Sequence, residues 1–95
     1  MADVLNPNST IRKHADVLDT ELDGEIVLMS VETGKYYGLD ATGSAIWRHL
    51  AEPVALTALV AALADEFEAD RESLERDVRD FIGTLAERQL IEIAP

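Results

Sequence analysis

The side chains best suited to acid–base, metal or nucleophilic chemistry are two histidines and four serines. His14 and His49 stand far apart, in neither an H-x-x-x-H spacing nor a patterned set of acidic ligands, so no metal site is predicted. The serines lack a neighbouring nucleophile-elbow motif; they are Ser9, Ser30, Ser44 and Ser73. The absence of cysteine excludes disulfides, thiolate catalysis and Cys-ligated metal. We therefore expect neither catalysis nor a cofactor.

Acidic side chains dominate the charge, with 19 Asp and Glu against 8 Lys and Arg and a net charge of -11. On such a chain, paired carboxylates such as Asp65 and Glu66 are typical of a solvated helix face. The charge repels phosphate backbones and no glycine-rich phosphate loop is present, so nucleic acid is not expected as a partner. No apolar run approaches the roughly 18 residues of a membrane span. We expect a soluble, cytoplasmic protein with no membrane partner.

The first half of the chain predicts a small antiparallel sheet. From Asp16 to Leu22 apolar and polar positions alternate, as in a half-buried strand. Asp23-Gly24 then predicts a tight hairpin turn, because glycine tolerates positive φ. The next strand, residues 25–31, is apolar on both faces and is therefore predicted to be central. A third strand is predicted at residues 35–39.

Three helices are predicted to follow the strands. Asp40 is well placed to cap a helix over residues 41–50. A second helix is predicted over residues 56–67, although Ala55 stands where a polar cap is expected. A third helix begins after Asp70. Its apolar stripe consists of Leu74, Val78, Phe81, Ile82 and Leu85.

These elements fit one small α+β domain, with a three-stranded antiparallel sheet followed by three helices. The polar start of the chain shows little periodicity. We therefore expect residues 1–10 to form a flexible N-terminal segment and residues 11–95 to form the folded domain. A short extended tail is expected at residues 90–93.

In a sheet of this order the first and third strands are both edges. Asp16, Asp19 and Glu21 discourage pairing along the first strand, whereas residues 35–39 carry a single charge, at Lys35. A bound peptide could add to this edge as a fourth strand. Alternatively, the third strand is too short to pair with anything, and its tyrosines pack on neighbours. The residue pattern leaves both interpretations open.

A longer motif bears on this choice. Residues 34–47 read G-x-Y-Y-x-L-D-x-x-G-x-x-I-W, and with Asp23-Gly24-Glu25 and Leu90-Ile91 they resemble the PqqD-like family over about residues 11–93. The resemblance implies a winged helix-turn-helix fold and a role in recognising the leader of ribosomally made precursor peptides. The leader would add to the third strand and rest against the third helix. By position, the peptide-binding residues implied are Lys35, Tyr36, Tyr37, Gly38, Leu39, Leu74, Val78, Phe81, Ile82 and Leu85.

Within that family, the chain resembles the stand-alone proteins of lasso-peptide pathways more than the pyrroloquinoline quinone protein, whose Trp-rich strand is absent. The resemblance implies a non-catalytic adaptor with three partners: the precursor peptide, a leader peptidase of the cysteine-protease type and an ATP-dependent cyclase. Since side chains alternate along a strand, Tyr36 and Tyr37 point to opposite faces, and at most one faces the third helix.

Two other functions compete with this one. A winged-helix DNA-binding regulator would share the fold, but the predicted third helix mixes its arginines with at least as many acidic residues, and a DNA reader needs a net basic face. A homodimer could pair its own edge strands, and the tyrosines would then serve self-association.

Overall fold

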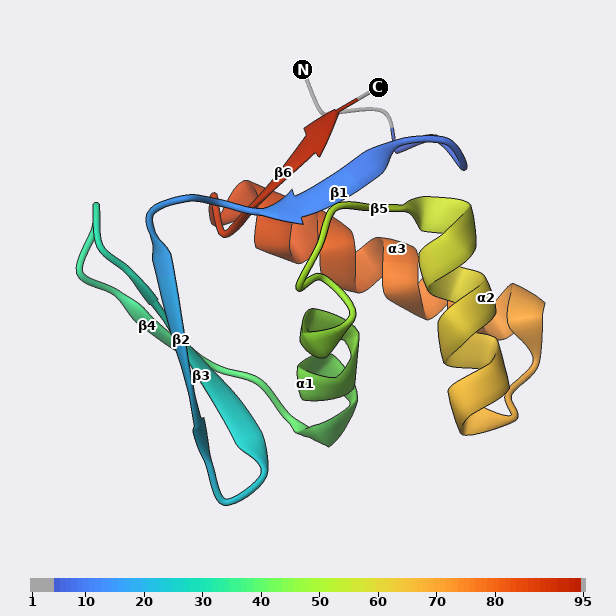
Figure 1. Ribbon diagram of the computed structural model, residues 1–95, viewed down its shortest axis with the longest axis horizontal. Coiled ribbons are helices and arrows are strands. Elements are labelled where there is room, and N and C mark those ends of the chain that lie inside the picture. The colour runs from blue at the N-terminus through green and yellow to red at the C-terminus, as the bar shows by residue number, and fades with distance from the viewer. Residues whose placement is uncertain (1–4, 95) are drawn as a thin grey trace.

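Two small antiparallel sheets and three helices form the fold in the computed structural model, which describes residues 5–94 (Figure 1). One sheet, called the wing below, has the strand order β2-β3-β4 and consists of β2 (Val17–Leu22), β3 (Glu25–Ser30) and β4 (Tyr36–Gly38). The other has the order β5-β1-β6 and consists of β5 (Val54–Ala55), β1 (Thr10–Lys13) and β6 (Ile91–Ala94). The helices are α1 (Ala41–Arg48), α2 (Leu56–Phe67) and α3 (Arg71–Glu87). The predicted α+β fold, a three-stranded sheet followed by three helices, is confirmed.

The wing forms where the alternating pattern predicts it. The hairpin turn places Asp23 and Gly24 at positive φ, 53° and 83°, and pairs Leu22 with Glu25. β3 is the central strand, as predicted, and its inward side chains are buried while its outward ones are only partly covered. The expectation that the first strand is half-buried was wrong: β2 is exposed beyond Val17, since no described element covers its outer face.

The second sheet was not predicted. β1 pairs with β6 from Thr10↔Ala94 to Lys13↔Ile91, so the expected extended tail is a paired strand. The expected boundary after residue 10 falls inside β1. Just before it, Ser9 is buried and its Oγ accepts a hydrogen bond from the backbone N–H of Asn6 at 2.9 Å. The first four residues of the expected flexible segment lie outside the described residues.

The helix starts follow the predicted caps. The Asp40 carboxylate accepts a hydrogen bond from Gly43 N at 2.7 Å, and Asp70 caps α3 in the same way. Ala55 provides no side-chain cap. At α2 the cap comes instead from the backbone before β1, because the Thr57 N–H donates to the carbonyl of Pro7 at 3.0 Å.

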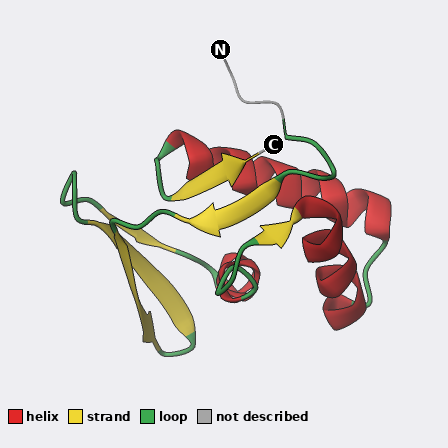
Figure 2. Cartoon of the chain, turned by 45° about the horizontal axis from the view of Figure 1, so that its top comes forward, coloured by secondary structure: helices red, strands yellow, loops and turns green. Residues whose placement is uncertain are grey.

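A single core joins the helices to both sheets. Ile11 of β1, Leu28 of β3 and Trp47 of α1 all belong to it, together with the buried stripes of α2 and α3. α1 stands between the wing and α2, while β5-β1-β6 lies beside α3 (Figures 1 and 2). No helix within residues 5–94 is long and apolar enough to cross a membrane.

Candidate functional site

β4 forms an open edge of the wing, because it pairs with β3 on one side only. Two backbone bonds set the phase of this pairing: Ser30 N donates to Lys35 O at 2.9 Å, and Leu39 N donates to Ile26 O at 2.8 Å. Hydrogen-bonded and non-bonded pairs alternate along an antiparallel ladder.

The residues of β4 can therefore be sorted by the direction of their backbone groups. Tyr37 shares the phase of Lys35 and Leu39, so its N–H and C=O face β3. Those of Tyr36 and Gly38 face the open side. These two residues can bind the backbone of an added strand without losing a bond inside the wing.

The end of this edge is fixed to α1 through a buried hydroxyl. Ser44 Oγ accepts a hydrogen bond from Ile26 N at 2.9 Å and donates to Leu39 O at 3.3 Å. It thus replaces the ladder bond that Ile26 N would otherwise donate to Leu39 directly. Ser44 therefore positions β4 through its hydroxyl group.

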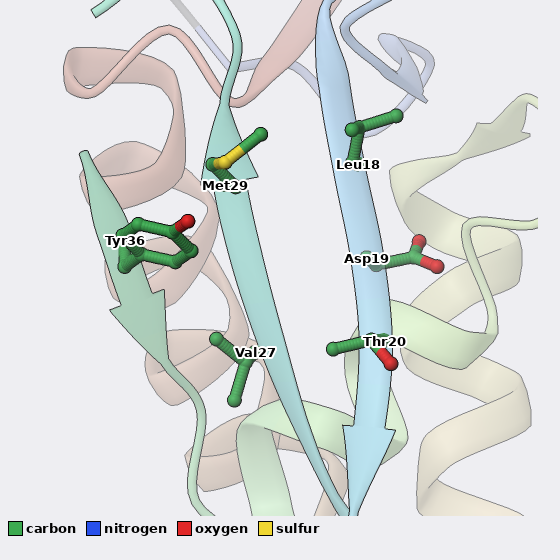
Figure 3. Close-up of a pocket in the computed structure, with 6 residues that line it drawn as sticks. All are labelled: Leu18, Asp19, Thr20, Val27, Met29 and Tyr36. Carbon is green, nitrogen blue, oxygen red and sulfur yellow. The ribbon is translucent and has the colours of Figure 1, made fainter. Parts of the chain in front are cut away.

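The two tyrosines of β4 lie on opposite faces, as predicted. Tyr36 pairs with Met29 on the outer face of the wing, is 70% exposed and lines a hollow there with Leu18 and Val27 (Figure 3). Tyr37 pairs with Leu28 on the inner face and packs against the core. Tyr37 is therefore the tyrosine on the side of the helices.

Arg88, the C-cap residue that follows α3, lies against the inner face of β4. Its guanidinium carbon is 4.9 Å from the centroid of the Tyr37 ring, within the range of a cation–π contact. The resemblance did not single out Arg88. It lies seven residues after Phe81, about two helical turns, and that spacing is the sequence signal that could have found it.

Gly38 is not required by the fold. A Cβ added there would meet nothing within 4 Å, and its φ lies outside the left-handed region that favours glycine. By contrast, Gly24 and Gly34 have positive φ. The glycine at position 38 leaves the open edge of β4 uncovered on the outer face, where another chain could approach closely.

The residues implied on the third helix separate into two groups. Four of them are buried in the core and offer little surface, with Leu74 the most exposed at 9%: Leu74, Val78, Ile82 and Leu85. Phe81 is only partly buried, and its ring packs on the first turn of α1, 3.1 Å from where a Cβ of Gly43 would lie. The structure therefore places Lys35 to Gly38 and Arg88 at one edge, with Leu39 buried beneath it, and places Phe81 against α1.

The histidines make structural contacts. His49 Nε2 lies 2.7 Å from Glu66 Oε1, which links the end of α1 to α2, and His14 Nδ1 accepts a hydrogen bond from Asp16 N at 3.1 Å. Within residues 5–94, no three potential metal ligands of the His, Cys, Asp or Glu type come together. The chemistry available at the β4 edge is that of backbone hydrogen bonding beside an aromatic ring and a cation.

Comparisons with known structures bear on this edge. The chain is similar to TbiB1 in complex with the TbiA(beta) leader peptide, with a TM-score of 0.80 and 41% identity over 85% of this chain and 94% of that one. It is also similar to a lasso peptide synthetase B1 complexed with the leader peptide, with a TM-score of 0.76 and 23% identity over 86% and 96% of the two chains.

A third structure shares the fold: the PqqD truncation of Methylobacterium extorquens PqqCD, described as a stand-alone RiPP recognition element. Its TM-score is 0.72, with 19% identity over 87% of this chain and 88% of that one. No curated protein matches the sequence. The family of Coenzyme PQQ synthesis protein D (PqqD) matches residues 25–91. With that match over more than half of its length, the chain belongs to the PqqD family.

Proposed function

We propose that this protein is a non-catalytic adaptor that binds the leader of a ribosomally made precursor peptide, in a lasso-peptide pathway, by antiparallel strand addition to β4. The observation that carries the proposal is the open β4 edge, where Tyr36 and Gly38 turn unpaired backbone groups outward. The 41% identity to TbiB1, captured with a leader peptide, supports it.

The β4 edge suits a peptide better than the edges formed by β5 and β2. β5 has two residues, which is too short for a stable added strand. β2 has acidic side chains engaged with α1, since Asp19 binds Trp47 and Glu21 binds Arg48. β4 carries no charge, and the ring of its partly buried Tyr37 lies against Arg88. The four buried residues of α3 would act indirectly, by forming the core against which Tyr37 packs.

The implied enzyme partners, a leader peptidase of the cysteine-protease type and an ATP-dependent cyclase, are part of the proposal. The outer face of the wing is available to such a protein, because Leu18 and Leu22 are 57% and 60% exposed there. Contiguous exposed apolar side chains commonly mark interaction sites. An added peptide strand would extend this same face, so a processing enzyme docked on the wing would meet the peptide as well.

Gly38→Pro tests strand addition at β4. Proline removes the outward N–H but no ladder bond to β3, and edge strands tolerate it. We expect the affinity for the leader to fall roughly 10-fold or more, because an acceptor of the peptide is left unpaired. Gly38→Ala is the matched control: it keeps the N–H, its Cβ has open space, and it should bind nearly as the unmodified protein does.

Binding is measured by fluorescence anisotropy with the labelled leader of a lasso-peptide precursor, and folding by circular dichroism. Equal affinity of the proline and alanine variants would remove β4 from the proposal. Light scattering on the same samples tests the homodimer. If Gly38→Pro converts a dimer into a monomer, the edge serves self-association instead.

A further inference from the structure

Two unpaired cations border the β4 edge of an otherwise acidic protein. Of the 8 Lys and Arg residues, four make ion pairs: Arg12, Lys13, Arg48 and Arg79. Four make none within residues 5–94: Lys35, Arg71, Arg76 and Arg88. Lys35 immediately precedes β4 and Arg88 lies on its inner face. Unpaired positive charge is thus placed where the peptide is proposed to bind.

Arg88 retains its hydrogen-bonding capacity in this position. Its contact with Tyr37 is made through the face of the ring, with the guanidinium carbon 4.9 Å from the centroid. A guanidinium that stacks on an aromatic ring still has five N–H donors, whose fork geometry matches a carboxylate. Arg88 is exposed, so these donors are open to a ligand.

The ladder phase determines which peptide residue would meet Arg88. Tyr36 and Gly38 would exchange hydrogen bonds with the added strand, so the residue between them, Tyr37, would face a peptide residue in a non-bonded pair. Such pairs have the shorter Cα separation, about 4.5 Å, and their side chains lie on the same face. The peptide side chain opposite Tyr37 would therefore lie on the inner face, beside the tyrosine ring and its arginine.

Lys35 adds a second positive charge on the same face as Arg88. It shares the inner face with Tyr37, since the two are two residues apart on an extended chain, about 7 Å along the strand. An acidic peptide is repelled by the net charge of -11 as a whole. At this one position the two cations would outweigh that repulsion, because salt screens the field of distant charges more strongly than that of near ones.

We propose that Arg88 is a specificity-determining residue that selects leaders with Asp or Glu at the position opposite Tyr37, flanked by the two residues that hydrogen-bond to Tyr36 and Gly38. This inference rests on the proposed strand addition at β4. It adds the chemical class of one leader side chain, a carboxylate, to a site otherwise formed by backbone and aromatic groups.

A peptide selection tests the proposed strand addition and the proposed role of Arg88 separately. Random 12-residue peptides are selected by mRNA display on the unmodified protein, on Arg88→Glu and on the control Arg76→Glu. Arg76 is exposed, forms no ion pair in the described part of α3, and lies about 18 Å along the helix from Arg88. The control therefore matches the change in net charge without changing the site.

We expect the unmodified protein and Arg76→Glu to enrich peptides with Asp or Glu at one fixed position, and Arg88→Glu to favour Lys or Arg there. For one enriched peptide, replacing the acid by its amide should weaken binding roughly 5-fold at low salt. The same replacement should have no effect on Arg88→Gln.

The outcomes that contradict the inference differ from those that contradict the proposed function. Enriched peptides without an acidic position, or an acidic preference that survives in Arg88→Glu, would overturn the role of Arg88 and leave strand addition standing. If the unmodified protein enriches no peptide, the adaptor function itself fails, and the inference with it.

Discussion

Asp19 connects three elements through one carboxylate. Its Oδ2 accepts hydrogen bonds from Trp47 Nε1 at 2.8 Å and from Lys13 Nζ at 3.3 Å. Lys13 in turn lies 5.0 Å from the centroid of the Trp47 ring. The hydrogen bond from the indole lowers the pKa of Asp19 below 3.8, with Lys13 contributing in the same direction and burial opposing both. A residue of the exposed strand β2 thus links the wing to β1 and α1.

Asp19→Asn should make this link weaker in a pH-dependent way. Because the folded pKa is lowered, the charged carboxylate stabilises the fold above pH 3.8, and that stability is lost as the pH falls through the folded pKa. We expect a loss of about 0.5–1 kcal/mol in the free energy of unfolding at pH 7, since a charged hydrogen bond is screened at a carboxylate that is 40% exposed.

Urea unfolding at pH 7 and at pH values below 3.8 measures this difference. Asp16→Asn is the control for removing a charge, because the Asp16 side chain makes no hydrogen bond within the described chain. A constant difference between Asp19→Asn and the unmodified protein at all pH values would contradict the assigned cause.

At the scale of elements, α2 begins without a cap of its own. The backbone carbonyls of Ser9 and Pro7 accept hydrogen bonds from Leu56 N and Thr57 N, and the Thr57 hydroxyl also donates to Pro7 at 2.7 Å. The polar segment before β1 therefore supplies from a distance what Ala55 lacks.

Ala55→Ser should stabilise a truncated chain more than the full one. In a chain lacking residues 1–8 the carbonyl of Pro7 is gone, so a serine cap should recover about 1 kcal/mol. In the full chain Thr57 N is already bonded, and the gain should be smaller. Urea unfolding of the four proteins gives the coupling between the two changes. Equal gains in both backgrounds would mean that the segment does not cap α2.

The elements that the sequence predicts are those whose own pattern is sufficient. The wing follows from alternation and from Asp23-Gly24, and α1 and α3 follow from their aspartate caps. The β5-β1-β6 sheet could not be predicted in this way, because its strands have two to four residues and Thr10 pairs with Ala94 across the whole chain. Such pairing is decided by tertiary packing, which no local pattern records.

The candidate site could also be predicted only as far as local sequence pattern reaches. The β4 edge follows from the strand order, and the family motif singles out Tyr36 to Gly38. Periodicity finds the apolar stripe of α3 but not what covers it, so Val78 and Ile82 could not be told from Phe81. Arg88 acquires its position only because α3 ends beside Tyr37.

At the scale of the whole molecule, the wing has two separable surfaces: the β4 edge and the outer face. Leu18→Asp changes the outer face and leaves the edge, since Leu18 lies on β2 at the opposite side of the sheet. We expect unchanged leader affinity but a loss of roughly 10-fold or more in leader cleavage by the partner peptidase, because a charge would be buried at their interface.

Fluorescence anisotropy measures the affinity for the leader, and an assay with the purified peptidase measures the rate at which the precursor is cleaved. Phe67→Asp provides the matched control, since Phe67 is 41% exposed at the end of α2, away from the wing. If the peptidase cleaves the precursor equally fast with the Leu18→Asp and the Phe67→Asp proteins, it does not use the outer face.

The wing meets the rest of the molecule through the core side chains of β3, the polar contacts of β2 with α1 and Lys13, the link at residues 14–16, and Arg88 on Tyr37. A peptide bound to β4 and to Arg88 would contact the wing and the end of α3 at the same time, and would hold them at one relative orientation. The free energy of binding would then include the cost of fixing the angle between the wing and α3. Lengthening the link at residues 14–16 should consequently weaken binding while every contact residue remains in place.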